Sequence, residues 1–244
     1  MNARSAVELV FDAPDTAAAM GRAARSITAP AAIIPILHKT LRHDGSTWTG
    51  SMIVLPEDAD SASEIADAQV ERADDAVCRI AETRVQKGID LLYPKGRGPS
   101  GEAGLMQLVE YVISDPDERD DYYLCQDEVS APAMRVNWER GTVSRFIGLE
   151  RTEVHFSRPG FVDWDLVHVI GVRRSKFPSL FLRTRRDFDR FAKAAGRGTA
   201  KQVFSRWDDQ RTKVMTRFSQ PASASRRSAV LADAMPAPTE AVST

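Results

Sequence analysis

Cysteine is scarce in this chain of 244 residues. The two cysteines, Cys78 and Cys125, lie far apart, and neither belongs to a CxxC or CxxH pair. Structural zinc sites gather cysteine and histidine ligands at such short spacings, so we predict no metal site. Reduced, half-buried thiols are typical of proteins in a reducing compartment, and we therefore expect a cytoplasmic protein.

Long hydrophobic runs are also missing. The longest apolar stretch, 29-APAAIIPIL-37, contains two prolines. It is far too short to span a bilayer, which takes about 20 apolar residues. The first residues do not have the pattern of a secretory leader, since Arg4 is followed by Glu8 and Asp12 rather than by an apolar segment. We expect no membrane partner.

No short catalytic motif points to a reaction. The sequence has no GxSxG, no HExxH, no GxGxxG after a predicted strand and no recognisable Cys–His pair. The acidic residues at 115–121 and 163–165 are better explained as solvated turns, and His43-Asp44 as the turn of a hairpin. We therefore predict no catalytic residue and no cofactor, and we find no internal repeat.

Charge is distributed unevenly, although its sum is only −1. Residues 57–128 hold 19 acidic and 7 basic side chains, a net charge of −12. Residues 171–217 hold 14 basic and 4 acidic side chains, a net charge of +10. Such opposition indicates either an external partner for the basic region or pairing with the protein's own acidic half.

The first 92 residues are expected to form an arm, a hairpin and a long helix. Residues 1–30 are an alanine-rich arm, with a short strand, VELVF, and then a helix from about Asp15 that Pro30 ends. Residues 36–55 have the pattern of a β-hairpin with Asp44-Gly45 in its turn. Apolar residues at helical spacing over 61–92 predict the longest helix.

A glycine-rich segment, 94-PKGRGPSGEAG-104, has some features of an anion site. Its backbone N–H groups and two basic side chains would hold a phosphate, and the apolar residues 105–113 after it predict a helix whose N-terminus would help. However, Glu102-Ala103 stands where a phosphate loop requires Lys and Ser or Thr, so a flexible connection is the favoured interpretation. The residues of this weak anion site are Lys95, Gly96, Arg97, Gly98 and Gly101.

Residues from about 120 to 184 have the pattern of an antiparallel β-meander. Short apolar segments separated by turn signals predict successive strands. These segments are YYLCQDEV, AMRVNW, TVSRFIGLE, TEVHF, DLVHVIGV and SLFLRT. In TEVHF we expect Val154 and Phe156 to face inward, and Glu153 and His155 outward. DLVHVIGV is apolar on both faces, which predicts a central strand with His168 as a buried core histidine.

Two amphipathic helices are predicted after the meander, over residues 185–197 and about 200–218. Phe191 and Trp207 lie on their apolar sides, and Thr199 can cap the second helix. Each helix has a line of basic residues on its other side, unbroken by acids, which predicts contact with phosphate groups. The predicted nucleic-acid-binding residues are Arg173, Arg174, Lys176, Arg183, Arg186, Arg190, Lys193, Arg197, Arg206, Lys213 and Arg217.

These elements predict an α+β protein, in which an antiparallel β-meander packs with a long central helix and two C-terminal amphipathic helices. One domain is expected over residues 31–218, and a disordered tail over residues 219–244. The favoured function is a non-enzymatic nucleic-acid-binding or accessory protein. One alternative is an assembly or scaffold subunit whose basic face pairs with an acidic partner or another copy of the chain. Another is an enzyme with a dispersed site, and the element order also allows a pleckstrin-like, lipid-binding module by analogy.

Overall fold

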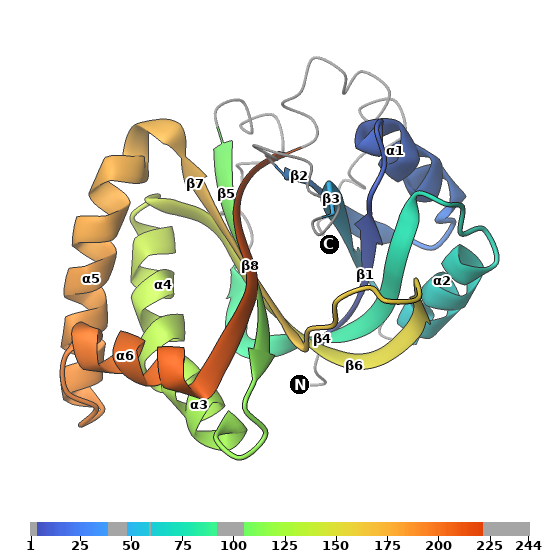
Figure 1. The fold of residues 1–244 in the computed structure, drawn as a ribbon. Coiled ribbons are helices and arrows are strands. Elements are labelled where there is room, and N and C mark those ends of the chain that lie inside the picture. The colour runs from blue at the N-terminus through green and yellow to red at the C-terminus, as the bar shows by residue number, and fades with distance from the viewer. Residues whose placement is uncertain (1–3, 39–47, 59, 92–104, 222–244) are drawn as a thin grey trace, which may run out of the picture.

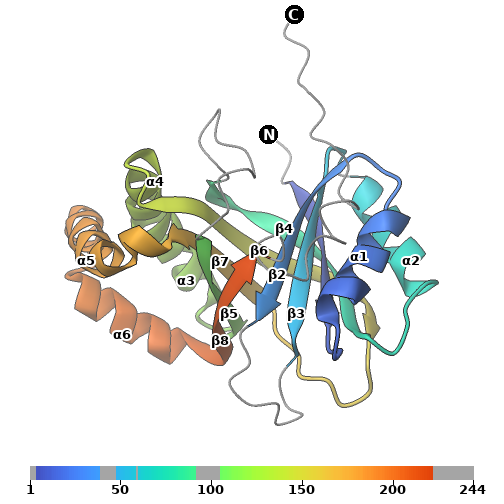
Figure 2. The same cartoon turned by 90° about the horizontal axis from the view of Figure 1, so that it is seen from above.

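The strands of the protein close into a barrel. The computed structural model describes residues 4–38, 48–58, 60–91 and 105–221. The strand order around the barrel is β1-β3-β2-β8-β5-β7-β6-β4, and all neighbouring strands are antiparallel. Figure 1 shows helices α1 and α2 on one side of the barrel and α3 to α6 on the other. Figure 2, seen from above, shows the same two helical layers flanking the strands.

The first half of the chain has the element order β-α-β-β-α-β. Its elements are β1 (Ser5–Phe11), α1 (Thr16–Ser26), β2 (Ala31–His38), β3 (Gly50–Pro56), α2 (Ser61–Val70) and β4 (Val77–Leu91). Helix α1 begins where the Asp15 carboxylate accepts a hydrogen bond from the Ala18 N–H at 3.1 Å. The two helices cover the outer face of four strands, which is the ferredoxin-like arrangement.

The second half repeats this order with additional helices. Its elements are β5 (Leu105–Ser114), α3 (Arg119–Cys125), the π-helical turn η2 (Gln126–Ser130), α4 (Ala131–Glu139), β6 (Val143–Ser157), β7 (Leu166–Arg173), the 3-10 turn η3 (Arg174–Lys176), α5 (Phe177–Ala194), α6 (Ala200–Gln210) and β8 (Arg211–Pro221). Its strand order, β8-β5-β7-β6, matches β4-β1-β3-β2 in the first half. Pairing of β2 with β8 and of β4 with β6 joins the halves. The structure therefore contains an internal repeat that the sequence did not reveal.

Three hydrophobic cores follow from the alternation of side chains along the strands. One fills the barrel and includes Trp48, Tyr111 and Trp164, whose ring centroids lie 4.6 to 4.8 Å apart. The second lies between the first half's strands and α1 and α2. The third lies between the second half's strands and α3 to α6. Each outer face of the barrel thus has its own helical cover.

The α+β class, the antiparallel sheet and several local elements are confirmed. The hairpin of residues 36–55 is present, because β2 and β3 pair antiparallel with Ile36 opposite Ser51. Its predicted turn, His43-Asp44, lies outside the described residues. The strand in VELVF and the helix after Asp15 are also present, but β1 pairs with both β3 and β4. Residues 5–26 are therefore part of the barrel and its helical layer rather than a separate arm.

The prediction of a long central helix over residues 61–92 is wrong. Helix α2 ends at Val70, and Val77–Leu91 form strand β4. Bulges in β4 next to Ile80, Glu82 and Val85 interrupt the two-residue alternation, so the apolar positions mimic a helical period. Residues 105–113 also form a strand, β5, rather than the predicted helix. The prediction failed because a short apolar run has no period that separates strand from helix.

The predicted meander is only partly correct, and the sheet is larger. Its first two segments form α3, η2 and α4, where Pro132 lies in the first turn of a helix rather than in a turn between strands. Its last segment belongs to α5. TVSRFIGLE and TEVHF are one strand, β6, and DLVHVIGV is the central strand β7, buried on both faces as predicted. In β6, Val154 is 38% exposed, whereas the His155 side chain is only 8% exposed, so their expected orientations are wrong.

Both C-terminal helices have other bounds than predicted, since α5 already begins at Phe177 and α6 ends at Gln210. Gly196 and Gly198, with φ of 72° and 86°, separate α5 from α6. Thr199 forms the expected cap, as a reciprocal box with Gln202. Helix α6 ends at Gln210, so residues 211–221 form β8 rather than continuing the helix. In the described part of the chain, no helix has the length and apolarity needed to cross a bilayer.

Candidate active site

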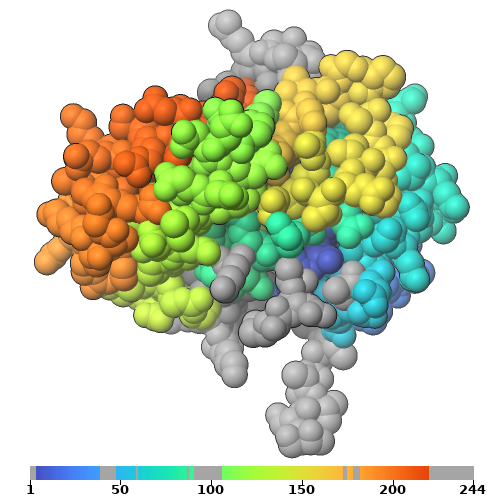
Figure 3. Space-filling view, turned by 90° about the horizontal axis from the view of Figure 1, so that it is seen from below, coloured from blue at the N-terminus to red at the C-terminus, as the bar shows by residue number. Residues whose placement is uncertain are grey.

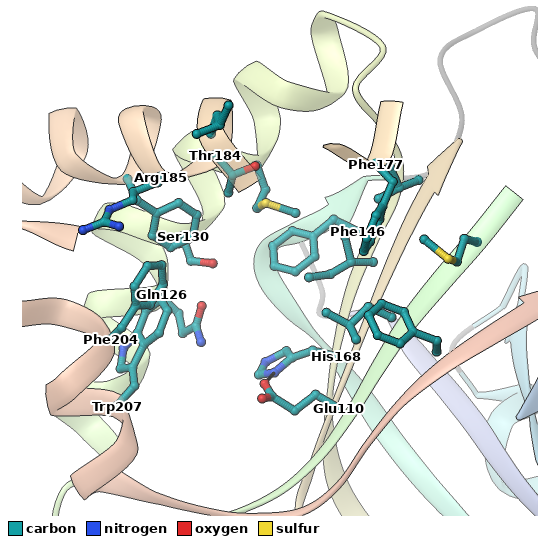
Figure 4. Close-up of a pocket in the computed structure, with 18 of the residues that line it drawn as sticks. Glu110, Gln126, Ser130, Phe146, His168, Phe177, Thr184, Arg185, Phe204 and Trp207 are labelled. Atoms are coloured by element: carbon teal, nitrogen blue, oxygen red, sulfur yellow. Dashed lines mark ion pairs between the residues drawn. The ribbon is translucent and has the colours of Figure 1, made fainter. Parts of the chain in front are cut away.

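A pocket of about 460 Å³ lies in the second half, between the outer face of its strands and its helices. Most of the lining is apolar and aromatic, which suits a largely apolar small molecule. Figure 4 shows Phe204 and Trp207 of α6 on one side of the pocket and Phe146 and Phe177 on the other. His168 and Glu110 lie side by side at one end of it.

His168 and Glu110 are the titratable pair of this pocket. They are directly opposite each other on β7 and β5, so their side chains lie on the same face of the sheet. His168 Nδ1 lies 3.7 Å from Glu110 Oε2, and the two side chains are 6% and 19% exposed. Their neighbours Val167 and Val169 point into the barrel, which leaves His168 facing the helices.

Glu110 is held as an anion. Its Oε2 accepts a hydrogen bond from Arg211 Nη1 at 2.8 Å, and its Oε1 accepts one from Nη2 at 3.4 Å. Burial alone would raise the pKa of Glu110, but His168 and Arg211 outweigh it and lower that pKa to about 2. Arg211 also donates to the Tyr122 hydroxyl at 3.1 Å, which fixes the guanidinium between α3 and β8.

Gln86 contacts the other nitrogen of His168. Its Oε1 lies 3.4 Å from His168 Nε2, and it reaches this position from the bulge of β4. Gly148 makes room for it, since a Cβ at that position would lie 2.3 Å from Gln86 Oε1. An amide oxygen only accepts, so Nε2 is the donor in this contact. Nε2 can act as a base when the ring carries its proton on Nδ1, towards the anionic Glu110, and the Gln86 amide turns away.

Further polar atoms among the pocket-lining residues have no hydrogen-bond partner in the described structure. Three of them are Gln126 Oε1, Thr184 Oγ1 and Trp207 Nε1. A buried polar atom without a partner carries a desolvation cost of about 1 to 3 kcal/mol. Together they offer one acceptor, one hydroxyl and one donor to the polar substituents of a mostly apolar ligand.

The basic residues predicted from the helices do not form one exposed line. Arg197 is 10% exposed and pairs with Asp121 at 2.8 Å and Glu128 at 2.6 Å. Arg206 Nη1 lies 3.7 Å from Asp121, and Lys213 lies on β8 with its Nζ 2.6 Å from Asp208. In these contacts the basic region is paired with acidic residues of the same chain.

The remaining predicted basic residues are spread over several elements. Arg183, Arg186 and Arg190 lie on α5 and line a hollow with Arg140 around Asp187. Lys193 is exposed near the end of α5. Arg173 ends β7, and Arg174 and Lys176 form η3.

Arg217 and the glycine-rich segment complete the set of predicted site residues. Arg217 is opposite Val109 in the sheet, which places it on the inner side of the barrel. The weak anion site at Lys95, Gly96, Arg97, Gly98 and Gly101 lies outside the described residues. Strand β5 follows that segment, so the helix predicted over residues 105–113, whose N-terminus would have helped to hold an anion, is not present.

Comparison with known proteins identifies the fold but no close relative. No family model matches the chain, and no curated protein matches its sequence. An anthrone oxidase-like protein shares 10% identity over 90% of this chain and 92% of its own, with a TM-score of 0.54. A protein of Fusobacterium nucleatum, provisionally named a monooxygenase, shares 9% identity over 91% of this chain and 93% of its own, with a TM-score of 0.51.

A third solved structure is a substituted chlorite dismutase from Candidatus Nitrospira defluvii. It shares 11% identity over 97% of this chain and 98% of its own, with a TM-score of 0.50. These likenesses show the fold, and the names of the similar structures are those of enzymes. The expectation of a non-enzymatic nucleic-acid-binding protein is therefore wrong, and the internal pairing of Arg197, Arg206 and Lys213 gives a physical reason for the basic residues.

Proposed function

We propose that the protein is an enzyme whose active site is the pocket of the second half. In this proposal His168 is the general base, and the substrate is a largely apolar aromatic molecule. The observation that carries it is the position of His168, 3.7 Å from the anionic Glu110 at one end of an apolar pocket of about 460 Å³. A histidine oriented by a carboxylate is a common arrangement for proton abstraction.

The surroundings of His168 favour proton transfer to its Nε2. The His168 side chain is only 6% exposed, so the charge of Glu110 acts on the imidazole through a medium of lower dielectric constant than water. Glu110 and Gln86 Oε1 both interact more favourably with the imidazolium than with the neutral ring. A positioned base of this kind contributes about 10²- to 10⁴-fold to a rate.

Oxidation by dioxygen is the reaction class that we propose to follow this deprotonation. The names of two similar structures, an anthrone oxidase-like protein and a provisional monooxygenase, belong to such chemistry. Anthrone has an acidic C–H bond between two aromatic rings, and its anion is rich in electrons and reacts with dioxygen. The overall reaction, anthrone and dioxygen giving anthraquinone and water, is balanced without another reductant.

The proposal is tested with anthrone in air-saturated buffer. Quinone formation and oxygen uptake are measured with the native chain, with His168→Gln and with Lys193→Gln as a control outside the pocket. We expect the native chain and the control to exceed the spontaneous rate at least tenfold, and His168→Gln to fall to background. Equal rates for the native chain and His168→Gln would contradict the role of His168.

A bound haem is a second candidate, favoured by the same pair of residues. A histidine that ligates haem iron usually has its other nitrogen directed at a carboxylate or carbonyl, as His168 Nδ1 is directed at Glu110. The fit is incomplete, because Nε2 lies 3.4 Å from Gln86 Oε1, and the amide must turn away before iron can bind there. Titration with haemin tests this: a Soret shift at one equivalent, absent in His168→Gln, would identify His168 as the ligand.

A further inference from the structure

We propose that Glu82, Glu153 and His155 form a binding site for a divalent transition-metal ion, with zinc as the best match. One ligand atom from each of the three residues lies within 4.8 Å of the other two. The residues come from β4 and β6, whose pairing joins the two halves of the barrel. This site is separate from the pocket of the second half, and the inference does not depend on the proposed function.

The two carboxylates oppose each other directly across the seam. Glu82 of β4 is paired in register with Glu153 of β6. Like charges in directly opposite positions of a sheet destabilise it. Within the described residues, no arginine or lysine forms an ion pair with either side chain. A cation between them would convert this repulsion into attraction.

His155 supplies the nitrogen ligand of the proposed site through its Nε2. A bulge beside it brings its side chain under α2, where it is 8% exposed. Its Nδ1 lies 2.9 Å from Asp67 Oδ1 of α2, and its Nε2 lies 3.6 Å from Glu82 Oε2. That Nε2 is buried and has no hydrogen-bond partner. Metal-bound histidines usually have this arrangement, with a carboxylate orienting one nitrogen and the other nitrogen free for the ion.

The ligand types select the metal. Calcium and magnesium prefer oxygen ligands alone, whereas zinc accepts imidazole together with carboxylates. Three protein ligands would leave a fourth tetrahedral position for water. The exposed side chain of Glu153 has the freedom to close around an ion. Figure 3 shows the yellow surface that includes β6 bordering the cyan and teal surface of α2 and β4, the region that such an ion would link.

The first experiment is a zinc titration of the full chain, followed by calorimetry. We expect one zinc ion per chain, with an affinity that falls at least tenfold in Glu153→Gln and in His155→Asn. Glu71→Gln, which removes an exposed carboxylate outside the cluster, should leave the affinity unchanged. Failure to bind one equivalent of zinc, or an unchanged affinity in Glu153→Gln, would overturn the proposal. Equally tight binding of magnesium would overturn the assignment to a transition metal.

A second measurement keeps the proposal testable if His155→Asn fails to fold. Glu153→Gln changes an exposed side chain and removes the repulsion with Glu82, so it should raise the melting temperature of the metal-free protein. Zinc should then raise the melting temperature of the native chain but not that of Glu153→Gln, since a ligand stabilises the state that binds it. A zinc-dependent rise of the same size in both proteins would show that zinc binds elsewhere.

Discussion

Glu8 and Arg79 form an ion pair inside the barrel, with 3.0 Å between Oε2 and Nη1 and both side chains 1% exposed. The same carboxylate oxygen accepts a hydrogen bond from Trp164 Nε1 at 3.1 Å, and Arg79 Nη2 donates to the Trp164 carbonyl at 2.9 Å. The Arg79 guanidinium also lies over the Trp164 ring, 4.2 Å from its centroid. Burial raises the pKa of Glu8, and Arg79 opposes that shift. The three side chains therefore hold β1, β4 and the segment before β7 together.

Replacement of either charged member of this pair should destabilise the protein strongly. Arg79→Leu is expected to lower the free energy of unfolding by about 3 to 5 kcal/mol, because it leaves the Glu8 carboxylate buried without its partner. The double variant Glu8→Leu/Arg79→Leu should lose much less than the sum of the single losses, since it leaves neither charge alone. Urea unfolding of the four proteins measures this coupling, and additive losses would contradict it.

Stability should depend on pH through His38. Burial, assisted by the positive charge of Arg217, lowers the pKa of His38 from 6.5 to about 3. Between these values the unfolded chain binds a proton that the folded chain does not, so stability is full above pH 6.5 and is lost as the pH falls. The expected slope from this residue is about 1.4 kcal/mol per pH unit.

The variant His38→Gln isolates this contribution. Glutamine can still hydrogen-bond to the Ser219 and Tyr111 hydroxyls that His38 contacts at 2.7 and 3.0 Å. Urea unfolding between pH 5 and 6 should show a shallower pH dependence in the variant than in the native chain. Parallel curves for the two proteins would mean that His38 is not buried in its neutral form.

A paired basic residue and an exposed one near the C-terminus should differ in how much stability they lose on replacement by glutamine. Arg197→Gln removes two charge-assisted hydrogen bonds, to Asp121 and Glu128, and should cost about 1 to 2 kcal/mol of stability. Lys193→Gln changes an exposed side chain and should alter stability by less than about 0.5 kcal/mol. Thermal unfolding at low and high salt checks both values, and the Arg197 effect should shrink with salt.

Glu110 should act on the reaction through His168. With anthrone as substrate, Glu110→Gln should lower kcat more than it changes KM, because the carboxylate stabilises the imidazolium formed during proton abstraction. A change confined to KM, with kcat unaltered, would contradict the proposed pair.

Several elements could be predicted from the sequence because their signals are local. Asp15 before α1 and the Thr199–Gln202 box before α6 satisfy backbone N–H groups within a few residues of themselves. The β2–β3 hairpin and the doubly apolar strand β7 were also predictable, since neighbouring residues determine a hairpin and a continuous apolar run indicates burial on both faces.

The site left a weaker sequence signal. Glu110 and His168 each interrupt an otherwise apolar segment, and such isolated polar residues mark positions to examine. Nothing in either segment shows that the other lies opposite it, because cross-strand register depends on the whole sheet. The sequence therefore indicated a buried histidine but not its carboxylate partner or the pocket.

The sequence by itself determined the Thr199 cap, the hairpin, the central strand and the uneven charge. Only the tertiary structure decided that residues 77–91 and 105–114 are strands, because a strand is stabilised by partners far away in the chain and bulges hide its period. The tertiary structure also decided which groups the basic residues contact. A run of arginines is the same in sequence whether it faces solvent or, as at Arg197, two carboxylates from helices elsewhere in the chain.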